Sequence, residues 1–354
     1  MNNNDLKDFI FSLCSVMSVS GFEKRAEAQI SELTKGMFDS DYTDAVGNRI
    51  LLKKCNRQGA PRVLIDAHLD EIGMIVTDIC RGGFLRIANL GGIDVSIMQA
   101  ADVVIYGKET LRGVIVSMPP HLKKDDALPA ADELLIDTGL CEDKLRELVD
   151  IGTPVGFAPI YGEMLGDHLI GKSFDDKACA ACAIWAVAQT PADQLAADVY
   201  VMLSATEETN RLGGASAGAF VCDPDYAMVI DVNLARVPDT KNYETVEMGG
   251  GVSISLSAAT DRRLSLATAE LCREKGIDFC TIAAPSSTGT NATTVNLVGL
   301  GIPTVDVGLP LACMHTYNEV ISMKDVNTLV SLVREFICSD KIATQMARRE
   351  VSFI

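Results

Sequence analysis

Hydrophobic and polar residues alternate with three different spacings along the chain. Residues 6–17 have helical spacing, and Ser20 with Glu23 has the spacing of a capping box for a second helix that runs to about residue 37. Residues 63–67 form an apolar run interrupted only by Asp66, which is typical of a buried central strand. The N-terminal part therefore predicts two helices followed by the core of a sheet.

The spacing changes after residue 73 and again after residue 165. Between these points, short β-type runs separated by Gly-Gly, Pro-Pro and charged segments predict a small β-barrel or sandwich. Beyond Lys172, helical and strand patterns alternate, which predicts a mixed α/β sheet with helices on both faces. We expect a discontinuous larger domain of residues 1–73 and 166–354, with an inserted β domain of residues 74–165.

Side chains able to bind metal follow the predicted strands. In mixed α/β sheets ligands bind beyond the carboxyl ends of strands, so these side chains are expected to converge there. Two imidazoles and several carboxylates suit a pair of divalent cations that activates water, so the pattern predicts a metallohydrolase. The candidates are His68, Asp70, Asp175, Asp176, Glu207, Glu208, Asp231 and His315.

The residue types suggest how two metals could be shared. One metal would take an imidazole and a carboxylate, the other would take a second such pair, and an aspartate at a helix start would bridge them. Each metal would keep one open position, as catalysis requires. The expected ligands are His68 and Asp231 for one metal, Glu208 and His315 for the other, and Asp175 as the bridge.

Two further carboxylates are expected to act without binding metal. Glu207 is adjacent to Glu208 and would move a proton from water to the leaving amine. Asp70 would accept a hydrogen bond from the remote nitrogen of His68, the usual partner of a ligating histidine. Taken singly, such residues are more often strand-end hydrogen bonders or helix caps, so the prediction depends on their occurring together.

Other residues with metal or redox chemistry are interpreted as structural. Cys179 and Cys182 have the spacing of a redox motif, but they lie in an Ala-rich run that predicts a buried helix. His121 and His168 lie in or beside the inserted region and are assigned as non-ligands. Cys313 shares a strand face with His315, and we favour a buried thiol there.

Composition and charge narrow the classes of partner. A net charge of −17 and a pI near 4.6 argue against nucleic acid, whose phosphates require a basic surface. No stretch approaches the roughly 18 to 20 apolar residues of a membrane span. The 11 cysteines lack framework spacing, which suits a reducing interior, so we expect a cytoplasmic protein.

The ordered set of motifs resembles the M42 aminopeptidases, related to the glutamyl and deblocking aminopeptidases. The resemblance implies a fold of the co-catalytic metallopeptidase type, two zinc or cobalt ions per subunit, and removal of N-terminal residues from short peptides. It also implies the ligand, base and orienting roles given above, and an inserted β domain in a homo-oligomer built from dimers, commonly a hollow dodecamer. The motifs are residues 18–23, 44–48, 66–73, 90–94, 114–121, 171–176, 206–208, 230–232 and 314–316.

Two departures from the family pattern keep other functions open. The turn at residues 209–212 is longer and more polar than usual, and Arg211 within it could favour acidic substrates. Asn291 stands where the family commonly has aspartate. The alternatives are an N-acyl amino-acid deacylase on the same metals, an endoglucanase and an inactive assembly protein. An endoglucanase would leave the histidines without a role, because a glycosidase needs two carboxyls and no metal.

Overall fold

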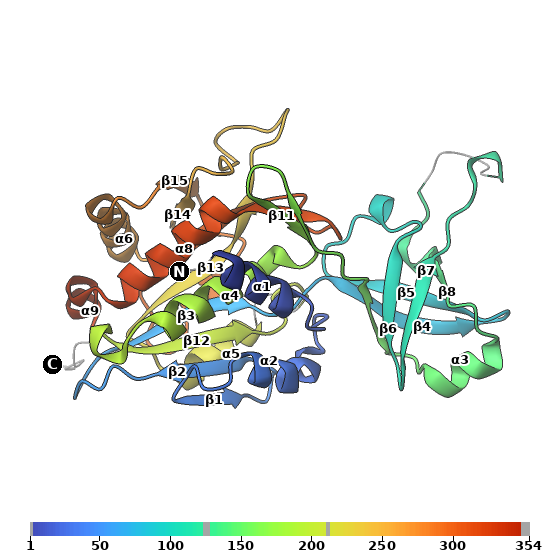
Figure 1. Ribbon diagram of the computed structural model, residues 1–354, viewed down its shortest axis with the longest axis horizontal. Helices are drawn as coiled ribbons and strands as arrows, with labels where there is room; N and C mark the ends of the chain where they lie inside the picture. The colour runs from blue at the N-terminus through green and yellow to red at the C-terminus, as the bar shows by residue number, and fades with distance from the viewer. Residues whose placement is uncertain (1–2, 123–127, 210–212, 348–354) are drawn as a thin grey trace.

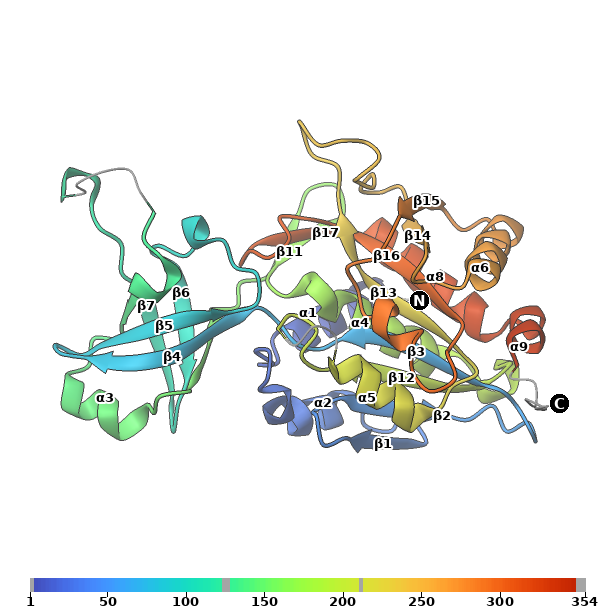
Figure 2. The same ribbon diagram turned by 180° about the vertical axis from the view of Figure 1, so that it is seen from behind.

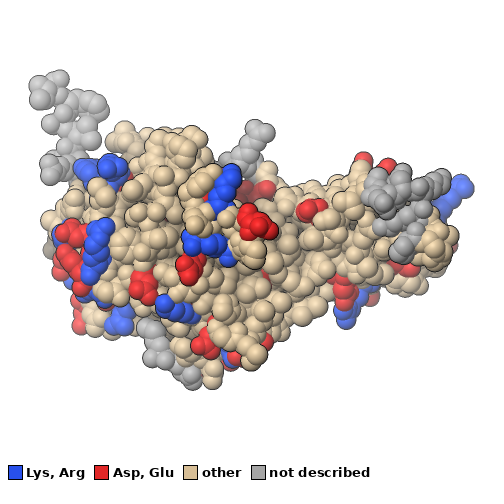
Figure 3. Space-filling model, turned by 90° about the horizontal axis from the view of Figure 1, so that it is seen from above, with Lys and Arg blue, Asp and Glu red and all other residues tan. Residues whose placement is uncertain are grey.

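The computed structural model describes residues 3–122, 128–209 and 213–347. The molecule is elongated, with a larger α/β part beside a smaller barrel (Figure 1). Seen from above in Figure 3, the barrel extends to one side, and acidic and basic side chains are interspersed over the larger part. Among the helices within the described ranges, none is long and apolar enough to cross a membrane.

The larger part is built on one mixed sheet, in which the described residues form 11 strands. Its four central strands β12, β3, β13 and β16 run parallel, and the outer strands are mostly antiparallel. The main path is β1 (Ser40–Thr43), β2 (Arg49–Lys53), β12 (Asp198–Ser204), β3 (Arg62–His68), β13 (Tyr226–Leu234), β16 (Thr304–Ala312), β17 (Glu319–Ser322), β11 (His168–Gly171) and β10 (Gly162–Met164). Off this path, β14 (Val252–Ser257) pairs with β16 on one side and with β15 (Phe279–Ala284) on the other.

Helices cover both faces of the sheet. In Figure 1, α1 (Asn3–Cys14), α4 (Phe174–Gln189) and α8 (Met323–Ile337) lie in front of the sheet, and the reverse view in Figure 2 shows α5 (Gly213–Cys222) on the other side. Successive strand residues point to opposite faces, so Ile65 packs toward α4 and Leu64 packs toward α5. The remaining α-helices are α2 (Glu27–Leu33), α3 (Glu142–Leu148), α6 (Arg262–Lys275), α7 (Ala292–Val295) and α9 (Asp340–Met346).

The Ala-rich run forms α4, and both of its cysteines are fully buried free thiols. Burial raises the pKa of each thiol, which keeps Cys179 and Cys182 protonated and inert. Small residues along α4 let it lie close to β3 and α8 in the centre of the main core. The interpretation of the two cysteines as structural agrees with this arrangement.

The smaller part is a closed barrel with its own hydrophobic core. Closure leaves no edge strand unpaired, which a sandwich would not achieve. The prediction of an α/β fold with an inserted barrel-like unit is confirmed. The strand order is β4 (Gly73–Cys80), β5 (Phe84–Leu90), β8 (Leu135–Asp137), β7 (Thr110–Ile115), β6 (Asp102–Tyr106) and β9 (Pro154–Phe157), with short 3₁₀ turns at Val95–Ile97, Pro120–Leu122 and Ala131–Glu133.

The capping box expected at Ser20 and Glu23 is wrong. The second helix begins with a 3₁₀ turn, Glu23–Ala26, that has no side-chain cap. Glu23 Oε1 instead accepts hydrogen bonds from the backbone N–H groups of Gly21 and Thr206, each at 2.9 Å. The Ser20 hydroxyl lies 2.6 Å from the Thr209 hydroxyl. The two polar side chains therefore hold the loop after β12 rather than the helix start.

A buried ion pair lies where the chain passes between the two parts. Glu71, just before β4, binds the ammonium groups of Lys172 and Lys177, the latter at 3.3 Å, and all three side chains are buried. Ser173 Oγ also donates to Glu71. Burial opposes the charge on Glu71, but the two lysines outweigh it and lower its pKa to about 2.

Glu71→Gln is expected to destabilise the protein by roughly 3–5 kcal/mol, because it leaves two buried ammonium groups without their counter-charge. Urea unfolding of the metal-free protein at pH 7 would measure this loss. The matched control is Glu163→Gln, which removes an exposed ion pair with Lys7 and should change stability by less than about 1 kcal/mol. Equal effects of the two substitutions would contradict the role of Glu71.

The same pair predicts a pH dependence. The pKa of Glu71 is lower in the folded chain than its ordinary value of 4.5, so its stabilisation is complete above pH 4.5 and is lost as pH falls toward 2. The difference in unfolding free energy between wild type and Glu71→Gln should therefore shrink across this window, by roughly 3 kcal/mol. A difference that does not change with pH would contradict the lowered pKa.

Candidate active site

The predicted site lies at one level near the carboxyl ends of the central parallel strands, where β3 and β12 end and β13 and β16 continue for a few residues. Ser204 of β12 is in register with His68 of β3, and Asp231 of β13 is in register with Gly308 of β16. The pairing of β3 with β13 places Asp66 opposite Val229, so His68 and Asp231 follow two residues later on the same face. Parallel pairing thus brings residues 163 positions apart in the sequence to neighbouring strand ends (231 − 68 = 163).

Two imidazoles approach the two oxygens of one carboxylate. His68 Nε2 lies 3.1 Å from Asp175 Oδ1, and His315 Nε2 lies 3.4 Å from Asp175 Oδ2. On the outer sides, His68 Nε2 is 3.9 Å from Asp231 Oδ1 and His315 Nε2 is 3.5 Å from Glu208 Oε2. The structure therefore brings all five predicted ligands together, with Asp175 in the middle.

These distances fit the coordination of a divalent metal. Ligand atoms about 2.1 Å from a tetrahedral zinc lie about 3.4 Å from one another, close to the separations between the imidazole nitrogens and the carboxylates. His68, Asp175 and Glu208 offer donor atoms within 4.8 Å of one another. The buried lysines nearby, Lys172 and Lys177, are paired with Glu71 instead. A buried cluster of carboxylates without a basic partner suits a bound cation.

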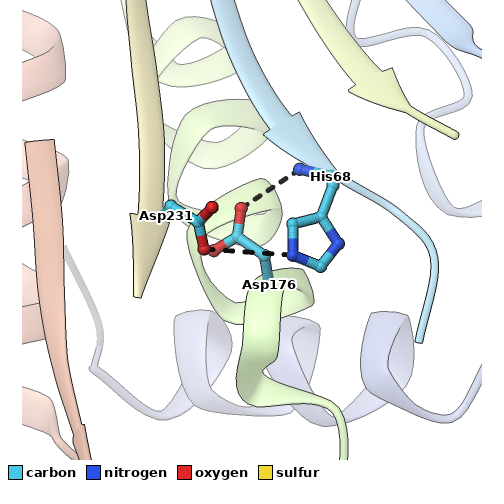
Figure 4. Close-up of side chains that lie close together, drawn as sticks. All are labelled: His68, Asp176 and Asp231. Carbon is cyan, nitrogen blue, oxygen red and sulfur yellow. Dashed lines mark hydrogen bonds and ion pairs between the residues drawn. The ribbon is translucent and has the colours of Figure 1, made fainter. Parts of the chain in front are cut away.

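Asp176, a candidate that received no specific role in the sequence analysis, is a further possible ligand. His68, Asp176 and Asp231 form a second group of donors within 4.8 Å, shown in Figure 4. Asp176 Oδ2 accepts a hydrogen bond from the backbone N–H of His68 at 3.1 Å, while its Oδ1 is buried without a partner. An unpartnered carboxylate oxygen beside two ligand residues is a position that a cation would satisfy.

Backbone carbonyls orient both imidazoles. His68 Nδ1 lies 3.0 Å from the carbonyl oxygen of Asp70, and His315 Nδ1 lies 3.1 Å from that of Gly92. If each Nδ1–H donates to its carbonyl, each Nε2 keeps its lone pair for the cluster. Gly92 follows β5 of the barrel, so the smaller part of the molecule contributes directly to the site.

Asp70 holds the site in a different way from the one expected. Its carboxylate is 3.6 Å from His68 Nδ1, too far for a hydrogen bond, and only its carbonyl accepts from the ring. The carboxylate oxygens accept from the backbone N–H groups of Glu207 and Glu208, each at 3.0 Å. These two N–H groups are fixed beyond the end of β12, so they compete successfully for the carboxylate. Asp70 therefore orients the glutamate pair.

Burial and mutual repulsion shift the pKa values of the cluster. Burial raises the pKa of Asp231 strongly and that of Glu208 to about 8. Burial would also raise the pKa of Asp175, but hydrogen bonds to both imidazoles lower it. The hydrogen bond to Asp175 raises the pKa of His315 to about 9. Burial works against a charged His68, but Asp175 and Asp231 outweigh it and raise its pKa.

Glu319 is a site residue that sequence reasoning missed. It is buried, and its two carboxylate oxygens accept from the backbone N–H groups of Asp175 and His315, each at 3.2 Å. One side chain thus positions the bridging residue and a second ligand. No sequence signal marks it, because it is a lone acidic residue at the start of β17.

The backbone beside the ligands adopts conformations that non-glycine residues rarely take. Ser173, Thr206 and His315 have φ values of 59°, 59° and 60°. Left-handed residues of this kind persist where surrounding contacts over-determine them, and they cluster at functional sites. Here Ser173 and Thr206 come shortly before Asp175 and Glu207, and His315 is itself an expected ligand. The strained residues therefore lie in the segments that position the site.

A cavity of about 330 Å³ opens from the cluster. All five expected ligands line it together with Glu207, and the rest of the lining comes from Val232, Asn233, Leu234, Thr288, Gly289, Thr290, Asp306, Val307, Gly308 and Met314. Asn291 does not line it: this buried amide donates to Ser204 Oγ at 2.8 Å beneath the strand ends. The other departure, at residues 209–212, lies with Arg211 mostly outside the described residues.

The remaining candidates lie elsewhere. His121 is in the 3₁₀ turn Pro120–Leu122 of the barrel, and His168 begins β11. Cys313 is exposed rather than buried, which corrects the expectation of a buried thiol. The physical reason is that β16 ends at Ala312, and the chain turns at Cys313 with a φ of 61°.

Gly92→Ala is expected to weaken metal binding by roughly 10–100-fold at the position of His315. A methyl group at residue 92 would lie 3.0 Å from His315 Nδ1 and would tilt the ring away from the cluster. Calorimetric titration of the metal-free protein with Zn²⁺ would measure the affinity. Gly162→Ala is the control, because its methyl group meets Ile170 at an ordinary 3.5 Å. Unchanged affinity in Gly92→Ala would contradict this role.

A mixed α/β sheet with imidazoles and carboxylates gathered at its parallel strand ends defines a metallohydrolase. The sequence profile described as M42 glutamyl aminopeptidase matches residues 47–332. The chain belongs to this family of metal-dependent aminopeptidases and is a hydrolase that acts on peptides.

Relatives and solved structures agree over nearly the whole chain. The chain is 27% identical to lysyl aminopeptidase of Pyrococcus furiosus over 90% of its own length and 93% of the relative. It matches the crystal structure of a TET aminopeptidase from the marine sediment archaeon Thaumarchaeota archaeon SCGC AB-539-E09 with a TM-score of 0.90 and 26% identity, covering 98% and 100% of the two chains. It matches the Pyrococcus horikoshii TET1 peptidase, which can assemble into a tetrahedron or a large octahedral shell, with a TM-score of 0.83 and 26% identity, covering 94% and 99%.

Proposed function

We propose that this protein is a dinuclear metal-dependent aminopeptidase that removes N-terminal residues from short peptides. The observation that carries the proposal is Asp175, whose two oxygens face the Nε2 atoms of His68 and His315. His68 and Asp231 would hold one cation and Glu208 and His315 the other, with Asp175 shared. The ligand set of imidazoles and carboxylates accepts zinc or cobalt.

Two bound cations would supply Lewis acidity and would lower the pKa of a water molecule held in the site. Glu207 lines the same cavity but is not needed as a ligand, so its carboxylate is free to accept a proton from that water. The same carboxylate would deliver the proton to the nitrogen of the leaving amine. Asp70 holds the backbone N–H of Glu207 at 3.0 Å and thereby keeps the base in position.

The charge of the cavity favours substrates with a free α-amine. Five carboxylates and two imidazoles are the ionisable groups of its lining, and among the described residues that line it there is no lysine or arginine. A free α-ammonium group is attracted to such a wall. An N-acyl amino acid would instead present a free carboxylate, which needs a basic partner. The lining therefore supports an aminopeptidase rather than a deacylase.

The barrel and the relatives support an assembled enzyme. We propose that residues 1–73 and 166–354 form the catalytic domain, and that residues 74–165 form an insert that contributes to a homo-oligomer. The P. horikoshii relative can assemble into a tetrahedron or a large octahedral shell, and this chain covers 99% of that relative. An assembly built from dimers, up to a dodecamer, would admit only short or unfolded peptides.

The test is release of free amino acids from a short peptide with and without an N-terminal acetyl group. The free-amine peptide should be cleaved from its N-terminus, the acetylated peptide should not, and a chelator should abolish cleavage until Zn²⁺ or Co²⁺ is restored. Cleavage of acetyl-amino acids in place of free-amine peptides would support a deacylase and overturn the proposal. Light scattering of the same sample would measure the assembly.

A further inference from the structure

A buried carboxylate in the lining of the cavity has no part in the proposed metal chemistry. Asp306 on β16 lines the cavity, and this residue is only 4% exposed. Its Oδ1 accepts a hydrogen bond from the Thr290 hydroxyl at 2.7 Å. Burial raises its pKa to about 6, and only the hydroxyls of Ser255 and Thr290 oppose this shift. Within the described residues, the charge of Asp306 is not balanced by a lysine or arginine.

The strand register places Asp306 at a defined depth below the metal cluster. Gly308 is opposite Asp231, and Asp306 is opposite Val229, so Asp306 lies two residues deeper on the same face as Asp231. Two residues along a strand span about 6.6 Å. An extended lysine side chain, with its four-carbon stem, reaches about 6 Å from Cα to Nζ. The depth of Asp306 therefore matches the length of a long basic side chain.

The cavity leaves room for such a side chain between the cluster and Asp306. The cavity has a volume of about 330 Å³, and Gly308 contributes no side chain to its lining at the level of Asp231. Thr288 and Thr290 form the facing wall, with their hydroxyls 2.9 Å apart. Because Thr290 donates its single proton to Asp306, Thr288 donates to Thr290. The hydroxyl chain fixes the Asp306 carboxylate without neutralising it.

We propose that Asp306 is the specificity-determining residue for the N-terminal side chain, and that the preferred substrates begin with lysine or arginine. This inference rests on the proposed aminopeptidase function. The scissile bond must lie at the cluster, so the first side chain of the substrate enters the rest of the cavity, where its cation pairs with Asp306. Glutamate or aspartate at that position is repelled by the same carboxylate.

The names of the relatives do not decide which side chain this site prefers. The family is described as glutamyl aminopeptidase, whereas one relative is a lysyl aminopeptidase. These names imply side chains of opposite charge, so the choice depends on the lining of this chain's own cavity. The described lining has one carboxylate beyond the catalytic cluster and no lysine or arginine.

The test compares three aminoacyl-anilides with free α-amines: lysyl, norleucyl and glutamyl. Norleucine has the lysine stem without its ammonium group, so the ratio of kcat/KM for lysyl over norleucyl substrate isolates the charge. Wild type is expected to favour the lysyl substrate at least about tenfold and to cleave the glutamyl substrate least. In Asp306→Asn, kcat/KM for the lysyl substrate should fall about 100-fold, while that for the norleucyl substrate changes less than about threefold. Asp193→Asn is the control, because Asp193 is exposed and outside the cavity.

Several outcomes would overturn the proposal. A preference of the wild-type enzyme for glutamyl or norleucyl substrates would overturn the proposal before any variant is tested. Equal losses on lysyl and norleucyl substrates in Asp306→Asn would show that Asp306 only holds the Thr288–Thr290 segment. If Asp306→Asn does not fold, Asp306→Ser replaces it.

A binding measurement separates this inference from the proposed function. Calorimetry with L-lysinol and L-norleucinol, which lack a scissile bond, reports recognition by the Zn²⁺-loaded protein without hydrolysis. Tighter binding of lysinol in wild type, lost in Asp306→Asn, supports the inference even if all three anilides stay intact and the aminopeptidase proposal fails. Equal binding of the two amino alcohols overturns the inference, whatever the activity.

Discussion

Glu207→Gln is expected to lower kcat by roughly 10²- to 10⁴-fold while both metal ions remain bound. The amide has nearly the same shape as the carboxylate, but it cannot accept a proton from water or pass one to the leaving amine. Asp70 would still hold the backbone N–H of residue 207, so the loop should keep its position. Steady-state rates on a free-amine anilide, with metal content measured by mass spectrometry, provide the test.

The adjacent Glu208→Gln is the matched control for this prediction. Glu208 lies 3.5 Å from His315 Nε2 and is proposed as a ligand, so its substitution should lower both metal content and rate. The pair of variants separates base from ligand, although the two residues are neighbours in sequence. A Glu207→Gln enzyme that retains near-normal kcat, or that loses metal as Glu208→Gln does, would contradict the assignment.

Asp175→Asn is expected to lower kcat/KM by more than about 100-fold and to reduce the bound metal from two ions to one or none. An amide offers one neutral oxygen in place of two charged ones, so it cannot bridge two cations as the carboxylate does. The measurement is metal stoichiometry after dialysis, together with the rate at saturating Zn²⁺. Retention of two ions with unchanged affinity would contradict the bridging role.

The exposed Asp193→Asn serves as the control for Asp175→Asn, because it removes the same charge far from the cluster. Its metal content and rate should match wild type. Glu319 offers a second comparison, since it accepts hydrogen bonds from the backbone N–H groups of Asp175 and His315 and is not one of the proposed ligands. Glu319→Gln should weaken metal binding less than Asp175→Asn does.

Much of the fold followed from local pattern. The apolar run at residues 63–67 predicted a central strand because burial on both faces leaves no polar alternation. The region after Gly73 predicted a β unit, yet the choice between barrel and sandwich could not be made. Both architectures have the same short strands, and closure depends on β9 pairing with β4 and β6, which are distant in sequence.

Residue type and spacing were enough to predict which chemical groups lie near the strand ends. His68, Asp231 and Glu208 each end a strand pattern, and strand direction in a parallel sheet then forces them to one edge. That reasoning needs only residue type and spacing. It also predicted Asp175 as the bridge, because a helix start is a rigid place for a carboxylate.

The hydrogen-bond partners that hold these groups, and the residues that line the cavity, could be seen only in the tertiary structure. The carboxylate of Asp70 accepts from two backbone N–H groups instead of a histidine ring. The carbonyl of Gly92 contacts His315 from the barrel, and Asp306 lines the cavity without a lysine or arginine partner. Each outcome depends on which of several possible partners comes nearest in space. Hydrogen bonds and ion pairs act over a few ångströms, whereas these partners are up to 223 residues apart in the chain, so pattern along the sequence carries no signal for them.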